Sequence, residues 1–451
     1  MPIHSLRSMV FASALLLHIN VTAPATAQLA PVIHVPDIQV EQLLPTNSLV
    51  SPANGSYPTC MVLIAPNEML VGIKSGHVKH VIDNVIQTTP VLTLPAQDFG
   101  EAGLLSMALD PEFGQGTGND KVYISYIVNV SDNGGNRIYS FDWNGQELVN
   151  RTLVTFLPVY RSSPSYYRHF GGYIRFGPPG APPAEQKLFV VVGDMDHRGK
   201  TLNYEDGPDP AGYGSIWRIN KDGTTPTGAD KGPFYGVADG NRYLEVMYAY
   251  GIRNSFGMDF DAETDKLWIT ENGNLNYDEI NLVEPGFNSG WGDRMGPTWR
   301  PDTVMLPSPG NLVTFGSPPV GTYADPVFSW KKTSVPTSMR FNTGTALGEE
   351  LAGVAFVCAG NGIYYFRPDE ERTGFILTGD LADKVFDPAR RENNVNYPED
   401  DNQQIRFIDN LGAPVDLHIG SDGNLYALSY FNRTIYKISR TTTDVENWSL
   451  Y

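Results

Sequence analysis

Short apolar runs recur along this chain and alternate with polar turns. In each copy an apolar run leads through a turn rich in Asp, Gly, Asn or Pro to a second run with aromatic or β-branched residues. A loop and a third run that contains Ile then follow. Short runs of this composition, bounded by turn-forming residues, are typical of β-strands. The pattern predicts a chain built mostly of β-strands.

The strand pattern occurs six times. The last copy is the clearest, with runs at 415–419, 424–428 and 433–438, and the other five begin near residues 61, 104, 173, 258 and 338. Each copy takes up roughly 70 residues, which is longer than the ~40 to 50 of a simple propeller blade and leaves room for inserted loops. A pair of β-sandwiches would fit the number of strands but not their repeated order.

We therefore predict an all-β fold, a six-bladed β-propeller with inserted loops over the central channel. Blades of this kind bury their faces against one another in a ring, and the loops over the channel form one binding surface. The two longest insertions, 193–213 and 287–335, are expected to build the rim of a site there.

The first 27 residues have the pattern of a secretory signal peptide. An apolar run from Met9 to Leu17 precedes Ala25-Thr26-Ala27, which fits an A-x-A cleavage site. The run is shorter than the roughly 20 apolar residues of a membrane helix, and no later stretch approaches that length. We expect a secreted protein without membrane insertion, with a signal peptide at 1–27 and a single propeller domain at 28–451.

Two further features agree with an extracellular protein. Five Asn-X-Ser/Thr sequons follow the leader, and they fit a glycoprotein. These sequons are at Asn54, Asn129, Asn150, Asn432 and Asn447. The two cysteines, Cys60 and Cys358, could form a disulfide in an oxidising compartment, but they are so far apart in the sequence that only the fold can decide whether they meet.

Charge and composition narrow the classes of partner. The chain has 50 acidic and 32 basic residues, and this balance argues against nucleic acid, whose phosphates select basic surfaces. A hydrophobic fraction of 41% allows a large core. The excess carboxylates either keep the surface soluble or in part hold calcium, which takes oxygen ligands.

Two residues of the third repeat are candidates for acid–base chemistry. His169 stands directly before the first strand, followed by Phe170 and two glycines, and an imidazole there can face the channel and take a proton. Asp194 follows the second strand, where a carboxylate could orient that imidazole. A hydrogen-bonded loop histidine and a turn aspartate that bonds its own backbone are the alternatives.

The fourth repeat adds a cation and a polar turn. Arg253 and Asn254 precede its first strand, where a guanidinium could bind a carboxylate or a developing oxyanion, or form a simple salt bridge. The turn Glu271-Asn272-Gly273-Asn274 follows its second strand, and its glycine would let backbone carbonyls approach a cation. Neighbouring repeats thus place polar residues at equivalent positions.

Together these segments resemble the glucose/sorbosone dehydrogenase family, which includes soluble sugar dehydrogenases that use pyrroloquinoline quinone (PQQ) on a six-bladed propeller. The resemblance spans about residues 60 to 440. The matching segments are Gly100 to Leu105, Asp110 to Phe113, His169 with Gly171-Gly172, Gly193-Asp194, Tyr250 to Asn254, and Asp278 to Leu282 through Gly290-Trp291. The signal peptide and sequons are similar to those of the eukaryotic secreted pyranose dehydrogenases of this superfamily.

The resemblance implies roles for the catalytic positions. His169 would take the proton of the sugar's anomeric hydroxyl while hydride passes to the quinone, and Asp194 would support it. Arg253 would bind the reactive carbonyl side of PQQ and stabilise its reduced form. Electrons would then pass to an external acceptor such as a cytochrome.

The resemblance also implies cofactor and metal contacts. Glu101, Asn254 and Asn272 would contact PQQ, and the carbonyls of Gly273 and Asn274 would hold calcium. One departure is that the sixth repeat lacks the arginine pair that bacterial members aim at the cofactor carboxylates. Arg406, Lys331 and Lys332 are the candidates to replace it.

The leading hypothesis is a secreted PQQ- and calcium-dependent oxidoreductase that oxidises an aldose or other pyranose at the anomeric carbon. A calcium-dependent hydrolase of the lactonase type is one alternative, since one fold can carry different sites. A non-catalytic propeller that binds an extracellular ligand is the other.

Overall fold

A computed structural model gives the fold of most of the chain. The signal peptide predicted at 1–27 and most of the insertion 193–213 lie outside the described residues. The structure describes residues 29–51, 55–128, 135–158, 168–196, 203, 211–237, 240–300, 304–305, 320–387 and 403–441.

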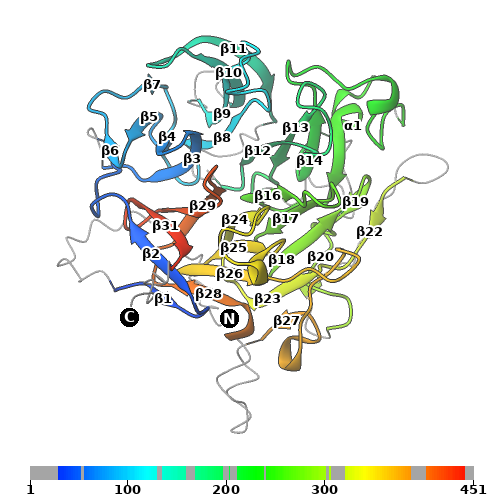
Figure 1. Ribbon diagram of the computed structural model, residues 1–451. Helices are drawn as coiled ribbons and strands as arrows, with labels where there is room; N and C mark the ends of the chain where they lie inside the picture. Colours follow the sequence, from blue (N-terminus) through cyan, green and yellow to red (C-terminus); the bar gives the residue numbers. More distant parts are fainter. Residues whose placement is uncertain are drawn as a thin grey trace, which may run out of the picture.

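The described chain is an all-β propeller, as predicted, with its sheets arranged side by side in a ring (Figure 1). The first sheet contains β3 (Pro58–Ala65), β4 (Glu68–Ile73), β5 (His77–Ile82), β6 (Val85–Ile86) and β7 (Leu92–Thr93). The second contains β8 (Leu104–Leu109), β9 (Lys121–Ile127), β10 (Asn136–Trp143) and β11 (Leu148–Phe156). The third contains β12 (Gly171–Gly177), β13 (Lys187–Val192), β14 (Ser215–Ile219), β15 (Met247–Tyr250), β19 (Phe287–Asn288) and β22 (Thr322–Tyr323).

Three further sheets continue the ring. The fourth contains β16 (Gly257–Phe260), β17 (Leu267–Glu271), β18 (Asn276–Val283), β23 (Phe328–Lys332) and β27 (Val385–Phe386). The fifth contains β24 (Pro336–Phe341), β25 (Ala355–Ala359), β26 (Gly362–Phe366), β28 (Arg406–Asp409) and β1 (Val32–Ile33). The last contains β29 (Pro414–Ile419), β30 (Leu425–Ser429), β31 (Thr434–Arg440) and β2 (Ile38–Gln42).

Elements outside these sheets are short. β20 (Arg294–Met295) and β21 (Val304–Met305) form a two-stranded ribbon, and the helices are α1 (Arg242–Val246), η3 (Gly228–Asp230), η4 (Glu349–Leu351), η5 (Gly379–Leu381) and η6 (Gln403–Ile405). Asn241 caps α1 by accepting hydrogen bonds from the backbone N–H groups of Tyr243 and Leu244. Among the described helices, none is long and apolar enough to cross a membrane.

The inner strands of the sheets form a closed ring. β3 contacts β8, β8 contacts β12, β12 contacts β16, β16 contacts β24, β24 contacts β29, and β29 contacts β3 again. The N-terminal strand β2 completes the last sheet by antiparallel pairing with β31, with Ile38 opposite Arg440. Because β2 and β31, from near the two ends of the described chain, share one sheet, backbone hydrogen bonds close the ring.

The apolar runs fold as strands because each sheet packs against neighbours on both faces. Five of the six residues of β13 are buried, and its side chains pack with Trp217 of β14 and with Ile127 of the second sheet. A strand buried on both faces reads as a continuous apolar run rather than an alternating one. The core therefore lies between adjacent sheets, as several separate clusters around the channel.

The two cysteines do not meet. Cys60 on β3 and Cys358 on β25 are both buried, both are free thiols, and they lie in different core clusters. Burial raises the pKa of both thiols, so they are unreactive core residues.

Candidate active site

Loops of the third and fourth sheets bring three of the predicted residues together. His169 precedes β12, Arg253 precedes β16, and Asp194 follows β13. Nδ1 of His169 lies 2.6 Å from Oδ1 of Asp194, and Nε2 of His169 lies 3.1 Å from Nη2 of Arg253. All three side chains are buried. The residues that the sequence singled out for chemistry therefore form one cluster at one mouth of the channel.

The hydrogen bonds determine the protonation of the imidazole. A guanidinium can only donate, so Nε2 of His169 accepts a hydrogen bond from Arg253 and carries no proton. Nδ1 then carries the ring proton and donates it to the Asp194 carboxylate. These two contacts favour the neutral tautomer of His169, in which Nε2 is the unprotonated nitrogen. A general base requires such a nitrogen to accept a proton.

Close contacts hold the His169 backbone in an uncommon conformation. Its φ angle is 54°, in the left-handed region, and its N–H donates to Oε2 of Glu101 at 2.6 Å. A Cβ atom on Gly193 would lie 2.0 Å from the carbonyl oxygen of His169, so only glycine fits there. Glu101, predicted to bind the cofactor, also accepts a hydrogen bond from Nδ2 of Asn254 at 3.2 Å. In this structure it positions two other site residues.

Asp194 is held from both of its oxygens. Oδ1 also accepts the backbone N–H of Asp196, and Oδ2 accepts a hydrogen bond of 2.7 Å from Nε1 of Trp291. Burial raises the pKa of Asp194. The contacts with His169, Arg253 and Trp291 lower this pKa by a larger amount, so the net pKa of Asp194 is below its usual value. Asp194 is therefore a carboxylate fixed in place beside the imidazole of His169.

The sequence had indicated Trp291 only as the end of a family segment, without a site role. Its indole is 3% exposed, and besides donating to Asp194 it lies under the guanidinium of Arg253, 5.3 Å from the ring centre. One signal could have identified Trp291. It stands just after β19, the strand by which the chain returns from β18 to the third sheet.

The turn after β17 holds Arg253 from the other side. The Arg253 backbone N–H donates to Oε1 of Glu271 at 2.6 Å, and Nη1 donates to the carbonyl of Asn272 at 2.8 Å. Burial raises the pKa of Glu271. The pKa of Glu279 is also raised, first by burial and then by the nearby charge of Glu271. Arg253 is thus aimed at His169 by contacts at both its backbone and its side chain.

The same turn contains the predicted calcium ligands. Gly273 donates its N–H to Asp278, and a Cβ on Gly273 would meet the carbonyl oxygen of Tyr277 at 2.2 Å, so the turn requires glycine. Asn274 is exposed beside it. Within the described residues no group of three or more His, Cys, Asp or Glu side chains is placed to hold a metal ion. Calcium binding at Gly273 and Asn274 through backbone carbonyls stays a prediction.

Three buried polar atoms test whether the site fits a bound cofactor. Nε of Arg253, Oδ1 of Asn254 and Oδ1 of Asn272 have no hydrogen-bond partner in the part of the chain that the structure describes. A buried polar group without a partner costs about 1–3 kcal/mol. One donor, on Arg253, and two acceptors, on Asn254 and Asn272, are therefore available to bond a polar ligand such as PQQ.

The candidates for holding the cofactor carboxylates are not at this mouth. Arg406 lies on β28, the fourth strand out from the channel, where it pairs with Asp409. Lys331 lies on β23, the fourth strand of its sheet, and bonds Asp387 at 2.9 Å. Lys332 is exposed at the end of the same strand. Sequence spacing could not place them, because strand order within a sheet is a tertiary property.

The family follows from comparison with known sequences. The model of the Glucose / Sorbosone dehydrogenase family matches residues 56–374, which is most of the chain and includes His169, Asp194 and Arg253. The chain belongs to the glucose/sorbosone dehydrogenase family. This confirms the resemblance that the site segments indicated.

Individual members of the family are distant from this chain. A Synechocystis protein described as uncharacterised is 29% identical over 249 residues, 52% of this chain and 56% of that protein. Aldose sugar dehydrogenase YliI of Escherichia coli is 25% identical over 291 residues, 63% of this chain and 70% of that protein. The chain thus spans little more than half the length of the first relative.

Solved structures of aldose sugar dehydrogenases are similar to this chain over about nine tenths of its length. The apo form of the soluble aldose sugar dehydrogenase of Escherichia coli has a TM-score of 0.64 at 22% identity, and covers 89% of this chain and 99% of that one. The PQQ-bound aldose sugar dehydrogenase of Streptomyces coelicolor has a TM-score of 0.59 at 19% identity, and covers 89% and 98%. At this level of identity the likeness concerns the fold.

Proposed function

We propose that this protein is a secreted, PQQ- and calcium-dependent dehydrogenase that oxidises an aldose or other pyranose at the anomeric carbon and passes the electrons to an external acceptor. The observation that carries the proposal is the buried chain of contacts from Asp194 through His169 to Arg253. Family membership supports it. In this proposal each of the six main sheets is one blade of the propeller.

The residues of the cluster have distinct tasks in this reaction. Oxidation of an anomeric C–OH group to a lactone removes two electrons and two protons. Nε2 of His169 takes the hydroxyl proton, and the Asp194 carboxylate stabilises the imidazolium that forms. Since Arg253 now donates to Nε2, the sugar hydroxyl takes the place of that guanidinium contact when it binds.

PQQ, when bound, would be the acceptor of the two electrons removed from the sugar. Arg253, Asn254 and Asn272 would hold it, because each has a buried polar atom without a partner among the described residues. Calcium would lie at the carbonyls of Gly273 and Asn274, beside the same turn.

Reconstitution tests the proposal. Protein produced without PQQ is titrated with PQQ in the presence of calcium, and reduction of a redox dye is then followed with a panel of aldoses. Saturable PQQ binding and dye reduction that needs PQQ, calcium and a sugar are expected. Failure to bind PQQ contradicts the proposal, and hydrolysis of lactones without any quinone favours the lactonase alternative.

A pair of variants separates the dehydrogenase from a non-catalytic binding propeller. His169→Ala should bind PQQ but no longer reduce the dye, whereas Arg300→Gln, at an arginine that pairs with Asp387 and contacts none of the candidate site residues in the described chain, should behave as the wild type. Sugar binding without dye reduction in the wild type would favour the binding propeller.

Secretion belongs to the same proposal. The leader at 1–27 supports it, and among the sequons in the described chain Asn150 is exposed on β11. Expression of the full chain in a eukaryotic host should release a glycosylated protein whose N-terminus is Gln28. Retention inside the cell with the leader uncleaved would contradict this part.

A further inference from the structure

Two buried asparagines join the two longest insertions of the chain. Asn203 lies in the insertion 193–213 and is fully buried, and Asn288 lies in the insertion 287–335 as the last residue of β19. Nδ2 of Asn203 donates to Oδ1 of Asn288 at 2.7 Å, and Nδ2 of Asn288 donates to Oδ1 of Asn203 at 2.9 Å. The two carboxamides therefore form a reciprocal pair that ties one insertion to the other.

The neighbours of the pair determine which atom of each amide is the donor. The backbone N–H of Gly290 can only donate, and it lies 2.9 Å from Oδ1 of Asn288, so that atom is an acceptor. The atom of Asn203 that faces it is then the Nδ2 donor. The same Nδ2 also lies 3.1 Å from the backbone carbonyl of Trp291, which can only accept. A carboxylate at position 203 would instead face two acceptors, so the contacts require an amide there.

The backbone of Trp291 is held on both sides. Its carbonyl accepts the hydrogen bond from Asn203, and its N–H donates to the carbonyl of Gly251 at 2.9 Å. Gly251 packs closely against the amide pair, since a Cβ there would lie 2.2 Å from Oδ1 of Asn288 and 2.7 Å from Nδ2 of Asn203. The amide pair and Gly251 together therefore set the position of the Trp291 backbone.

The side chain of Trp291 connects this backbone to the candidate active site. Nε1 of Trp291 donates to Oδ2 of Asp194 at 2.7 Å, and the indole lies under the guanidinium of Arg253. The other oxygen of Asp194 lies 2.6 Å from Nδ1 of His169. Hydrogen bonds weaken steeply when their length or angle changes, so a displaced indole would alter how Asp194 is held. The amide pair is thus linked to His169 through Trp291 and Asp194.

Burial makes the Trp291 segment depend on Asn203. A buried carbonyl that loses its donor is costly, so without the Asn203 amide the Trp291 carbonyl would move toward another partner. We propose that Asn203, paired with Asn288, is a positioning residue for the reaction: it holds Trp291 so that the indole N–H keeps Asp194 directed at His169. The link to catalysis rests on the proposed function, whereas the effect on the hydrogen bond between Trp291 and Asp194 does not.

The indole N–H of Trp291 reports this positioning in protein without PQQ. In a nitrogen–proton correlation spectrum, the indole signal that disappears in Trp291→Phe belongs to Trp291. Asn203→Ala should shift this signal and speed the exchange of its proton with solvent by at least about tenfold, because the hydrogen bond to Asp194 opens more often. Asn203→Ser should act in the same direction if Asn203→Ala does not fold, since its shorter side chain stops short of the Trp291 carbonyl.

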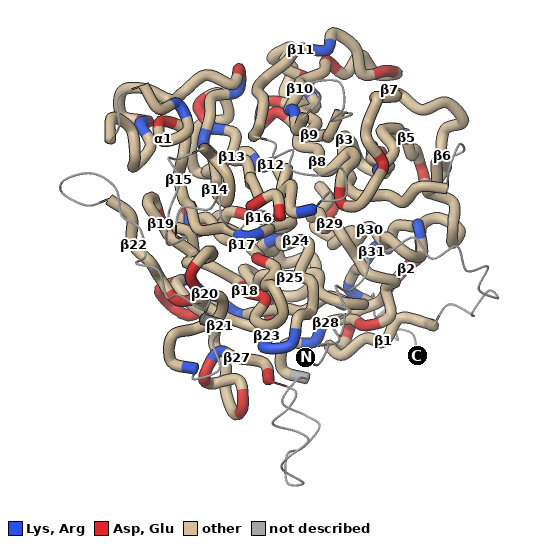
Figure 2. Tube along the Cα trace, turned by 180° about the vertical axis from the view of Figure 1, so that it is seen from behind, with Lys and Arg blue, Asp and Glu red and all other residues tan. Residues whose placement is uncertain are grey.

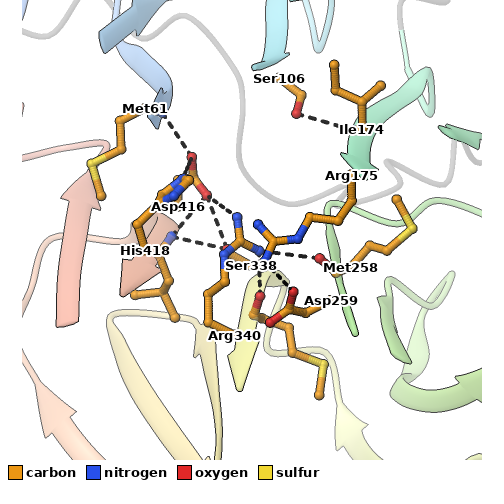
Figure 3. Close-up of polar contacts among 12 residues, drawn as sticks. Met61, Ser106, Ile174, Arg175, Met258, Asp259, Ser338, Arg340, Asp416 and His418 are labelled. Atoms are coloured by element: carbon orange, nitrogen blue, oxygen red, sulfur yellow. Dashed lines mark hydrogen bonds and ion pairs between the residues drawn. The ribbon is translucent and has the colours of Figure 1, made fainter. Parts of the chain in front are cut away.

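The opposite end of the inner strands provides a matched control. Figure 2 shows acidic and basic positions close together at the centre of the molecule, beside β16 and β29. At that end the guanidinium groups of Arg175 and Arg340, each near a carboxylate, turn toward each other (Figure 3). Asn342 follows β24 there, is 2% exposed, and donates from Nδ2 to the carbonyl of Leu351 at 2.7 Å. Asn342→Ala also removes a buried carboxamide, but it should leave the Trp291 signal unchanged.

The kinetics of protein loaded with PQQ and calcium test the link to the reaction. Asn203→Ala should lower kcat about five- to tenfold with little change in KM, because the base is misplaced while the contacts to the sugar are kept. Adding Asn203→Ala to Trp291→Phe should lower kcat little further, since both changes act on the same hydrogen bond. Asn342→Ala should keep the kcat of the wild type.

The outcomes separate the proposal from the proposed function. The proposal is overturned if the Trp291 signal and its exchange rate are the same in Asn203→Ala and the wild type, or if Asn342→Ala changes them equally. It is also overturned if the effects of Asn203→Ala and Trp291→Phe on kcat add in full. A changed Trp291 signal in a protein that reduces the dye with no sugar would contradict the proposed function and still support the role of Asn203 in placing Trp291.

Discussion

Nη2 of Arg253 donates a hydrogen bond of 3.1 Å to Nε2 of His169, the atom that would take the substrate proton. The base is therefore held neutral and covered by a cation until something displaces the contact. Nη1 stays on the carbonyl of Asn272 and the backbone N–H on Glu271, so the arginine can release His169 without leaving the site. This relationship joins the proposed base to the proposed cofactor contact.

Replacement of the base should separate chemistry from cofactor binding. In His169→Gln, sugar-dependent dye reduction should fall about 10²- to 10⁴-fold, the usual contribution of a positioned general base. PQQ affinity, followed by titration of the chromophore, should change by no more than a few-fold. Equal activity in variant and wild type would remove His169 from the mechanism.

Replacement of the arginine should weaken cofactor binding. Arg253→Lys keeps the charge but cannot reach both His169 and the carbonyl of Asn272, since an ammonium lacks the fixed fork of a guanidinium. PQQ should then bind about tenfold more weakly, measured as a smaller rise of the unfolding temperature at a given PQQ concentration. The idea fails if PQQ stabilises both proteins equally.

Asp194→Asn should affect both tautomer and acid stability. The amide can donate to Nδ1 and favour the wrong tautomer, so kcat should fall by about 10³ to 10⁴. The folded-state pKa of Asp194 is depressed, so its stabilising effect is present above the unfolded pKa and is lost as pH falls through the folded pKa.

The stability difference between wild type and Asp194→Asn should therefore be largest near neutral pH and shrink below about pH 4, near the ordinary pKa of an aspartate. Urea unfolding at a series of pH values measures it. A difference that grows on acidification would show that the carboxylate is not stabilised by His169 and Trp291.

Trp291 is predicted to be a positioning residue. Trp291→Phe keeps the ring under Arg253 but removes the N–H that bonds Asp194, which should cost about 1–3 kcal/mol of stability and raise the pKa of Asp194. kcat should fall about tenfold with little change in KM, and the acid limb of the pH–rate profile should shift. Trp299→Phe, at a half-exposed tryptophan, is the control and should change neither.

The turn after β17 should couple calcium to the cofactor. A Cβ on Gly273 collides with the carbonyl of Tyr277, so Gly273→Ala should distort the turn and abolish the calcium dependence of PQQ binding. Gly344→Ala, where a Cβ meets no atom within 4 Å, is the matched control. Chelation of calcium in the wild type should lower PQQ affinity as Gly273→Ala does, and PQQ binding that ignores chelation would contradict the assignment.

The repeats could be predicted because their signal is local. A run such as Leu188 to Val192 is apolar throughout since both faces of β13 are buried, and polar turns mark its ends. Outer strands carry less of that signal. β11 has four consecutive exposed residues from Asn150 to Leu153, and it forms because β10 offers a free edge.

Pairing between distant segments could not be predicted. The N-terminal strand β2 reads as an ordinary short polar strand, and its place beside β31 depends on the ring having closed. The failure of Cys60 and Cys358 to meet has the same cause, since they lie on different sheets.

The sequence by itself determined the strand repeats and the family, and it indicated His169, Asp194, Arg253 and Asn272 as candidate site residues, because strand repeats and family segments can be recognised from local pattern. Only the tertiary structure decided which atom of His169 faces Arg253, that Trp291 holds Asp194, and that Arg175 meets Arg340 at the far end of the channel. Those contacts join residues that are far apart in the sequence, and their geometry exists only once the chain has folded into the ring of sheets.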